Sequence, residues 1–327
     1  MSSLTSESEI PKTSNIQERK NVAFPIKTKQ ELELHAAKSK NCGQCSLSCP
    51  THRVGLFYPL GVLRSLQMGN IQQTLKKWNI NNCLCCNKCM VECPSCVTPN
   101  YLDEEGMNFA NLIREIRAYA VEHDLEDLDE ENAADTLWSL LPEGKDSPDT
   151  PYAKKIREDS RLKVKETGEI GFFPSHAMKG GEALFVHVAK AVVSVLNKVG
   201  FSPVVISSPG SGHDDYWAGH YREFEEVAQK NIDSILEAGV KTLVVEDAET
   251  YHTLKYVYPK VSTRFGKDVK VVHLSRFLLE GNLIRKLHFR PNLKFKLSVH
   301  DNSRLGRMDG GEYDAPRILF SKIKGLR

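Results

Sequence analysis

Residues 42–50, CGQCSLSCP, and residues 83–94, CLCCNKCMVECP, decide the fold of the amino-terminal part of this 327-residue chain. Both stretches contain closely spaced cysteines and end in Cys-Pro, and all cysteines of the protein lie between Cys42 and Cys96. The first stretch reads Cys-x-x-Cys-x-x-x-Cys-Pro. The second contains the complete run Cys-x-x-Cys-x-x-Cys-x-x-x-Cys-Pro. Such dense spacing brings several thiols to one point, so we expect a metal-binding domain around these two stretches.

The complete run has the spacing by which thiolates hold two iron–sulfur clusters in bacterial ferredoxins. Three closely spaced thiolates hold one cluster, and the proline after the fourth cysteine directs that sulfur toward the neighbouring cluster. Crossed ligation of this kind predicts two ligand sets. Cluster B is expected on Cys83, Cys86, Cys89 and Cys49, and cluster A on Cys42, Cys45 and Cys93.

Cluster A lacks a fourth thiolate, because Ser39 stands where a complete first motif would have cysteine. Three interpretations stay open. Ser39 could bind through its alkoxide. Cluster A could be a [3Fe–4S] cluster, or a [4Fe–4S] cluster with a non-cysteine or solvent ligand. Cys96 or Cys85 could supply the missing sulfur, although both could equally be small buried apolar residues.

Two other uses of dense cysteines fit this pattern less well. A structural zinc site closes with four ligands, usually in two pairs. Disulfides are expected in secreted proteins, and the polar residues 1–24 contain no apolar core of a secretory signal. Iron–sulfur clusters, most simply two [4Fe–4S] clusters, are therefore the expected cofactors.

Composition excludes several classes of function. The net charge is +2 and apolar residues make up 40 % of the chain, so no global field indicates a nucleic-acid or membrane-surface partner. The longest apolar stretch, Ala183–Val199, is interrupted by His187, Lys190 and Lys198, as in an amphipathic helix. We expect a soluble cytoplasmic protein that binds no nucleic acid and does not insert into a membrane.

The pattern of apolar residues divides the chain into four parts. We expect a disordered tail at 1–24, a helical ferredoxin-type domain at 25–123, an acidic and proline-containing linker at 124–164, and an α/β domain at 165–327. In the first domain, helical spacing covers 29–38, 59–68, 71–78 and 102–123.

In the second domain, short apolar strands alternate with helical stretches. Strands are expected at 170–173, 203–206, 242–245, 269–273 and 293–299, and helices at 182–199, 221–238, 248–257 and 275–283. The alternation predicts a parallel, doubly wound sheet, so the whole chain is an α+β multidomain protein. The basic stretch from Arg285 to Arg307 is expected to be a solvated face.

The first hundred residues resemble the C subunit of heterodisulfide reductase. This family has two cysteine motifs separated by a helical insert, and here the resemblance rests on Cys42–Pro50, Pro59–Met68 and Cys83–Pro94. The chain departs from the family at Ser39.

The second domain resembles the CCG domain of the heterodisulfide reductase B and D subunits. The resemblance rests on the flanks of that family's cysteines, here Phe172–His176, Ser211–Gly219, Val244–Tyr251 and His300–Arg307. The cysteines themselves are absent. The residues His176, Gly210, Ser211, Asp247, Thr250 and Ser303 stand in their places.

A cysteine-free CCG-type domain is expected to keep the fold of the family and to lose its cofactor. The replaced positions would then form a packing or docking surface. A metal or small-molecule site that includes His176 and Asp247, near the strand ends, is the alternative.

The two resemblances together imply an electron-transfer subunit of a heterodisulfide-reductase-like complex in thiol, disulfide or sulfur metabolism. Its partners would be a flavoprotein subunit and a catalytic subunit with intact CCG domains, and the chain would not be catalytic alone. A scaffold in that complex, or the iron–sulfur subunit of a lactate- or glycerol-phosphate-type dehydrogenase, are the alternatives.

Overall fold

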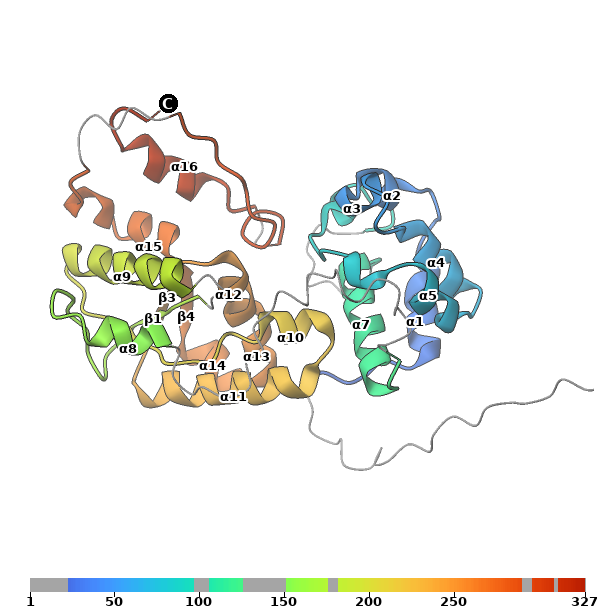
Figure 1. Cartoon of the computed structure of the whole chain (residues 1–327), viewed down its shortest axis with the longest axis horizontal. Coiled ribbons are helices and arrows are strands. Elements are labelled where there is room, and N and C mark those ends of the chain that lie inside the picture. Colours follow the sequence, from blue (N-terminus) through green and yellow to red (C-terminus); the bar gives the residue numbers. More distant parts are fainter. Residues whose placement is uncertain are drawn as a thin grey trace, which may run out of the picture.

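The computed structural model describes residues 23–96, 106–125, 151–175, 182–289, 296–308 and 311–326. In Figure 1 these residues form two lobes, which approach each other where α10 (His213–Ala218) faces α7 (Phe109–Glu122). Within the described ranges, no helix combines the length and the apolar character that crossing a membrane requires.

The amino-terminal lobe is helical. Besides α7 it contains α1 (Lys29–Ala37), α2 (Gln44–Ser48), α3 (Pro50–Arg53), α4 (Pro59–Gln67), α5 (Ile71–Lys77), the 3₁₀ turn η2 (Ile80–Asn82) and α6 (Lys88–Val91). Thr28 and Glu31 form a reciprocal capping box at the start of α1, and Pro59 occupies the first turn of α4, where a missing N–H costs nothing.

The helices predicted at 29–38, 59–68 and 71–78 are confirmed to within one residue at each end. The helix predicted at 102–123 starts later, at Phe109, because the side chain of Asn108 accepts a hydrogen bond from Asn111 N and caps the helix there. Residues 102–105 of that prediction lie outside the described residues. Residues 1–22 of the predicted disordered tail lie outside the described residues, and the prediction is wrong for Phe24, whose ring is buried.

The second lobe contains a four-stranded parallel sheet. Its strands are β1 (Ile170–Phe173), β2 (Val204–Val205), β3 (Thr242–Val245) and β4 (Lys270–His273), in the order β2-β1-β3-β4. Four of the five predicted strands are thus confirmed. The fifth is wrong at residues 296–299, which form no strand and are mostly exposed, with Leu297 45 % exposed. Residues 293–295 lie outside the described residues.

Helices cover both faces of this sheet, as the alternation of side chains along each strand requires. Phe172 and Val244 join the core under α8 (Pro151–Arg157) and α9 (Glu182–Lys198). Phe173 and Val245 join the opposite core with α11 (Tyr221–Glu237). A parallel α/β domain is therefore present, while its doubly wound topology stays a prediction.

The remaining helical elements connect the strands or follow the sheet. They are α12 (Ala248–His252), the π-helical turn η6 (Thr253–Val257), α13 (Tyr258–Val261), α14 (Thr263–Asp268), α15 (Leu274–Glu280), the 3₁₀ turn η7 (Leu283–Lys286) and α16 (Asp314–Ser321). Helix α8 falls within the segment that we expected to be a linker. Ala153 and Ile156 of α8 are fully buried against α9, so in the structure the packed α/β lobe begins at α8.

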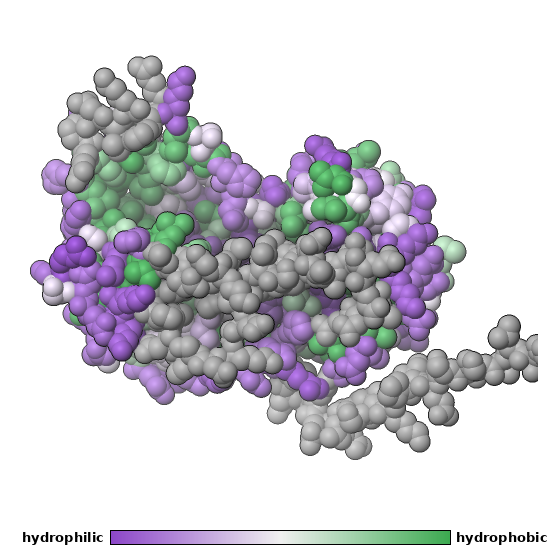
Figure 2. Space-filling model, viewed as in Figure 1, coloured by the Kyte–Doolittle hydropathy of each residue, from purple (hydrophilic) through white to green (hydrophobic). Residues whose placement is uncertain are grey.

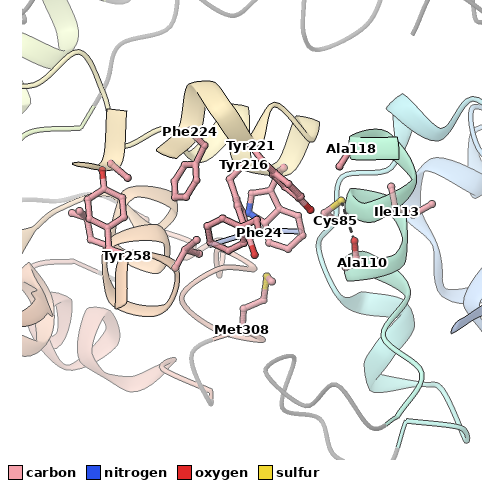
Figure 3. Close-up of a cluster of buried hydrophobic side chains, with 14 of the residues drawn as sticks. Phe24, Cys85, Ala110, Ile113, Ala118, Tyr216, Tyr221, Phe224, Tyr258 and Met308 are labelled. Carbon is pink, nitrogen blue, oxygen red and sulfur yellow. Dashed lines mark hydrogen bonds between the residues drawn. The ribbon is translucent and has the colours of Figure 1, made fainter. Parts of the chain in front are cut away.

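One continuous core joins the two lobes (Figure 3). The ring of Phe24 contacts Tyr216, Tyr221 and Phe224, with ring centroids 5.2–5.6 Å apart. On the other side of the junction, Arg114 of α7 donates hydrogen bonds to the hydroxyls of Tyr216 and Tyr221. The position of the α/β lobe relative to the cysteine motifs is therefore fixed by buried contacts.

Candidate cluster-binding site

The two cysteine motifs lie against each other, because α2 of the first motif packs against α6 of the second. Left-handed residues bend both loops: Asn41 and Gly43 flank Cys42, and Cys85 and Asn87 flank Cys86. Glycine and asparagine adopt this conformation most readily, which suits them to loops that turn tightly around a bound group. The local sequence thus builds the two loops, and helix packing brings them together.

The second motif and Cys49 line one small cavity. The cysteines at its wall are Cys49, Cys83, Cys85, Cys86 and Cys89, and Pro50, Phe57, Pro59 and Phe109 are among its other wall residues. Cys49 belongs to the first motif, and Pro50 starts helix α3 directly after it. The cysteines predicted to hold cluster B therefore share one cavity, as crossed ligation requires.

Cys45 lies near the remaining cysteines of the predicted cluster A. Burial raises the pKa of the Cys45 thiol, two hydrogen bonds with Ser46 oppose this effect, and the nearby Cys93 and Cys42 raise the pKa further. Cys42 is exposed, whereas Cys45 and Cys93 are half-buried. The group that contains Cys42 thus faces solvent.

The structure separates the candidates for a fourth ligand of cluster A. The hydroxyl of Ser39 accepts a hydrogen bond from Asn41 N at 3.2 Å, so it lies at the entrance to the first motif. Cys96 lies one turn after Cys93, with its N–H donating to Cys93 O at 3.2 Å. These hydrogen bonds do not choose between Ser39 and Cys96, and the fourth ligand of cluster A stays a prediction.

Cys85 lies on the side of cluster B. Its sulfur is 3.9 Å from Ala110 O, and Arg117 Nη1 donates to it at 3.5 Å. A hydrogen bond from Cys83 lowers the pKa of the Cys85 thiol to about 6; burial acts in the opposite direction, and the charge of Arg117 supports the shift. Cys85 therefore neighbours the cysteines of cluster B rather than those of cluster A.

Three arginines surround the second motif, and none of them was identified as a site residue from sequence. Arg117 Nη2 donates to Ile80 O and Cys83 O, both at 2.8 Å. Arg304 Nη1 donates to Cys85 O at 3.0 Å, and Arg307 Nε donates to Cys86 O at 2.9 Å. Arg117 belongs to the amino-terminal lobe, and Arg304 and Arg307 belong to the other lobe. Hydrogen bonds from both lobes therefore fix the loop of the second motif.

The expectation of a solvated basic face from Arg285 to Arg307 is wrong for Arg304, which is 4 % exposed. Its guanidinium lies over the ring of Trp217, 4.2 Å from the ring centroid. Stacking and the hydrogen bond to Cys85 O offset the cost of burying this charge. No local pattern in the sequence indicates this contact, because it joins segments more than two hundred residues apart.

The cysteines of the second motif share one cavity and supply the donor atoms that a metal cluster needs. Without a bound metal Cys89 is a neutral thiol, because burial raises its pKa and the neighbouring Cys86, Cys45 and Cys49 raise it further. Iron supplies the positive charge that stabilises several thiolates at one point. The donor set and its common cavity therefore fit an iron–sulfur cluster.

The positions that replace the cysteines of the CCG resemblance are engaged in internal hydrogen bonds. Asp247 caps α12 by accepting from Thr250 N at 2.6 Å. Gly210 O accepts from Asn231 Nδ2 at 2.8 Å, and Ser211 O accepts from Tyr258 Oη at 3.1 Å. Ser303 O accepts from Met308 N. His176 lies outside the described residues. These positions now stabilise the fold of the lobe.

Comparisons with known proteins agree with the cysteine geometry. Residues 40–98 match the family described as 4Fe-4S dicluster domain. The D subunit of the dihydromethanophenazine:CoB–CoM heterodisulfide reductase of Methanosarcina barkeri is 22 % identical over 337 residues, which cover 91 % of this chain and 75 % of the relative. The corresponding D subunit of Methanosarcina mazei is 21 % identical, with 88 % and 72 % covered.

A shorter match covers about half of the chain. The probable iron-sulfur-binding oxidoreductase FadF of Bacillus subtilis is 28 % identical over 164 residues, which cover 49 % of this chain and 21 % of the relative. No solved structure matches. The chain thus contains a 4Fe–4S dicluster domain and is homologous over most of its length to the D subunit of heterodisulfide reductase.

Proposed function

We propose that this chain, with its 4Fe–4S dicluster domain, is an electron-transfer subunit of a heterodisulfide-reductase-like complex. The observation that carries the proposal is the common cavity of Cys49, Cys83, Cys86 and Cys89, which joins the two motifs into one binding unit. When bound, iron–sulfur clusters supply one-electron redox chemistry. The protein's residues bind and orient the clusters and adjust their electrostatic environment.

We infer the following ligands. Cys49, Cys83, Cys86 and Cys89 would hold cluster B; Cys42, Cys45 and Cys93 would hold cluster A, with Ser39 and Cys96 as the candidates for its fourth ligand. Two [4Fe–4S] clusters are the simplest content, and a [3Fe–4S] cluster A is the alternative. Unless Cys96 supplies the fourth sulfur, the absence of a cysteine at position 39 makes the two clusters chemically unequal.

The proposed ligands of cluster A and cluster B differ in exposure, and this difference suggests which surface of the protein contacts a partner. Cys42 is exposed, while Arg304 and Arg307 of the other lobe close over the second motif. Large apolar side chains are exposed beside the first motif: Leu47 is 67 %, Val54 68 % and Leu56 50 % exposed. Figure 2 shows apolar side chains on the upper part of the lobe that contains α2 and α3. We propose that a redox partner docks there.

The partners in this proposal are a flavoprotein subunit and a catalytic subunit with intact CCG domains. The α/β lobe would be a doubly wound domain of CCG type that has lost its cofactor ligands. Internal hydrogen bonds at Gly210, Ser211 and Asp247 support this role, as does the support that Arg304 and Arg307 give to the second motif. None of the nine cysteines, all within the described residues, forms a disulfide, which suits a reducing compartment such as the cytoplasm.

The first test is cluster content. Anaerobically purified or reconstituted protein should contain iron and sulfide for two clusters and should give reducible signals in electron paramagnetic resonance (EPR) spectra. Protein with full iron content but no reducible signal would contradict the electron-transfer role.

The second test concerns docking. Leu47→Asp should slow electron transfer with the co-purified partner subunits while iron content stays unchanged, because it places a charge in the apolar surface beside Cys45. Leu184→Asp is the matched control, since Leu184 of α9 is equally exposed (66 %) but lies on the α/β lobe. Equal rates for both variants and the wild type would count against docking at this surface.

A further inference from the structure

Outside the cysteine motifs, three metal-ligating side chains converge at the start of two helices. The ligand atoms of His213, Asp214 and Glu249 all lie within 4.8 Å of one another. His213 and Asp214 open α10, which follows β2, and Glu249 lies in α12, which follows β3. Both segments thus lie beyond the carboxyl ends of parallel strands, where open α/β sheets bind ligands.

The backbone places these residues with little freedom. Gly212 precedes α10 with φ +69°, and a Cβ atom there would lie 2.8 Å from the ring of Phe224. A glycine is therefore required before His213. On the other side, Asp247 caps α12 and thereby sets Glu249 in the first turn of that helix.

The imidazole of His213 is oriented as in many metal sites. Its Nδ1 lies 2.7 Å from Thr253 Oγ1, and its Nε2 lies 3.9 Å from Glu249 Oε1. A metal-bound histidine typically coordinates through one ring nitrogen while an oxygen holds the other. The separation of 3.9 Å is too long for a hydrogen bond but leaves room for an ion between the two groups.

Further acidic side chains lie beside the three ligands. Asp215 and Asp247 are close to Asp214, and the guanidinium of Arg304 is also near the group. A bound cation would offset the mutual repulsion of these carboxylates.

We propose that His213 Nε2 and the carboxylates of Asp214 and Glu249 bind one divalent transition-metal ion of the Zn²⁺ or Fe²⁺ type. An imidazole nitrogen with two carboxylates is a donor set for such ions, whereas Mg²⁺ and Ca²⁺ prefer oxygen ligands alone. Three protein ligands leave a coordination position for water or a small ligand. The Glu249 side chain is 51 % exposed, so this position is open to solvent.

The site lies close to the second cysteine motif. The ring of His213 is 6.4 Å from the ring of Trp217, and Arg304 connects Trp217 to Cys85 O. The alternative site with His176 and Asp247 is not tested, because His176 lies outside the described residues; in the proposed metal site Asp247 is a neighbour of the ligands. This inference does not depend on the electron-transfer role proposed above.

Zinc is the probe for the test, because it is distinct from the iron of the clusters. Full-length, cluster-loaded protein is equilibrated anaerobically with equimolar Zn²⁺, separated from free ion, and analysed for zinc and iron. The variants are Asp214→Asn and Glu249→Gln, which keep the shape of each side chain. Asp215→Asn is the matched control, because Asp215 is the next residue of α10 but is not among the converging ligands.

We expect one zinc ion per chain in the wild type and in Asp215→Asn. Asp214→Asn and Glu249→Gln should lose zinc affinity by roughly tenfold or more. The iron content should be the same in all four proteins. Zinc-edge X-ray absorption should show nitrogen and oxygen neighbours at about 2.0–2.2 Å and no sulfur at about 2.3 Å. Zinc bound equally by all variants, sulfur neighbours, or no zinc in the wild type would overturn the proposal.

Discussion

Arg304 Nη1 donates a hydrogen bond of 3.0 Å to the main-chain oxygen of Cys85, a residue 219 positions earlier in the chain. The same guanidinium stacks on Trp217 of α10. One buried side chain therefore connects the loop of the second cysteine motif, the helix that faces it, and the carboxy-terminal segment. The α/β lobe is in this way part of the surroundings of the cysteine site.

Crossed ligation predicts which cysteine substitutions act on the same cluster. Cys49→Ala should remove the same EPR signal as Cys83→Ala, because both residues line one cavity, although Cys49 belongs to the first motif. Cys93→Ala should remove the other signal together with Cys42→Ala. The measurement is EPR of reduced protein with iron quantified. Cys85→Ala is the control and should retain both signals. If Cys49→Ala affected the Cys42 signal instead, ligation would follow sequence order.

The positive charge of Arg307 is predicted to raise the reduction potential of cluster B. Its Nε donates to Cys86 O, and positive charge stabilises the reduced, more negative cluster. Two unit charges about 10 Å apart at an effective dielectric constant of about 20 interact by about 1.7 kcal/mol, so Arg307→Gln should lower the potential of this one-electron couple by about 70 mV. Potentiometric titration followed by EPR measures this shift.

The control for that charge removal is Arg264→Gln in α14, since the Arg264 side chain is 73 % exposed and pairs with Asp268. It should leave both potentials unchanged. Equal shifts of both clusters in Arg307→Gln would show that the charge acts on the protein as a whole and not on cluster B.

The approach of α10 to α7 predicts a special requirement for glycine at position 219. Gly219 has φ +93°, and a Cβ atom there would lie 2.3 Å from Ala118 N. Gly219→Ala should destabilise the protein by more than the roughly 1–2 kcal/mol that a left-handed alanine costs by itself, because the helices must also separate. Thermal unfolding of anaerobic protein measures the loss.

Gly239→Ala is the matched control for this substitution. Gly239 has φ +74°, but nothing lies within 4 Å of its added Cβ atom, so only the backbone strain remains. A decrease in Tm of the same size in both variants would show that the close approach of α10 to α7 contributes nothing to stability.

The largely buried Glu246 predicts a dependence of stability on pH. Burial raises the pKa of Glu246 to about 7, although Ser175 N and Oγ donate hydrogen bonds to its carboxyl at 3.0 and 2.8 Å. Its unfolded pKa is about 4.3. A carboxyl with a raised folded pKa contributes stability below its unfolded pKa, and this is lost as the pH rises toward the folded pKa.

The wild type should therefore lose about 2–3 kcal/mol of stability between pH 5 and pH 8 that Glu246→Gln, which cannot ionise, retains. Melting temperatures across this range, measured on the anaerobic protein, test the expectation. Glu237→Gln on the exposed face of α11 serves as the control. The same pH profile in the wild type and in both variants would contradict a buried, titrating Glu246.

Much of the fold follows from local patterns in the sequence. The strands β1 and β3 and the helices α1, α4, α9 and α11 lie within about one residue of their predicted bounds, because apolar periodicity reports secondary structure directly. The incorrect secondary-structure predictions arise where the local sequence pattern favours one structure and tertiary packing another. The alternating pattern near Leu297 predicted a strand, but residues 296–299 pair with no strand of the described sheet.

The group of His213, Asp214 and Glu249 was only partly predictable. The sequence indicated a site near the strand ends, with His176 and Asp247, only as the alternative to a packing surface, whereas the three residues that converge are His213, Asp214 and Glu249. The signal that could have identified them is the run from Gly212 to Asp214, in which a glycine turn opens a helix with a histidine and an aspartate. Which partner faces that run depends on how α12 packs beside α10, and periodicity does not report packing.

By itself, the sequence determined the chemistry of the cysteine site, because the spacing from Cys42 to Pro94 fixes which thiols a short loop can bring together. Only the tertiary structure decided that Cys49 shares a cavity with the second motif, that Phe24 is buried at the junction, and that Arg304 and Arg307 close over that motif. The spacing of the cysteines involves only residues close together in the chain, so it can be read directly from the sequence. Contacts across 200 residues depend on which surfaces bury together, which is a property of the packed whole.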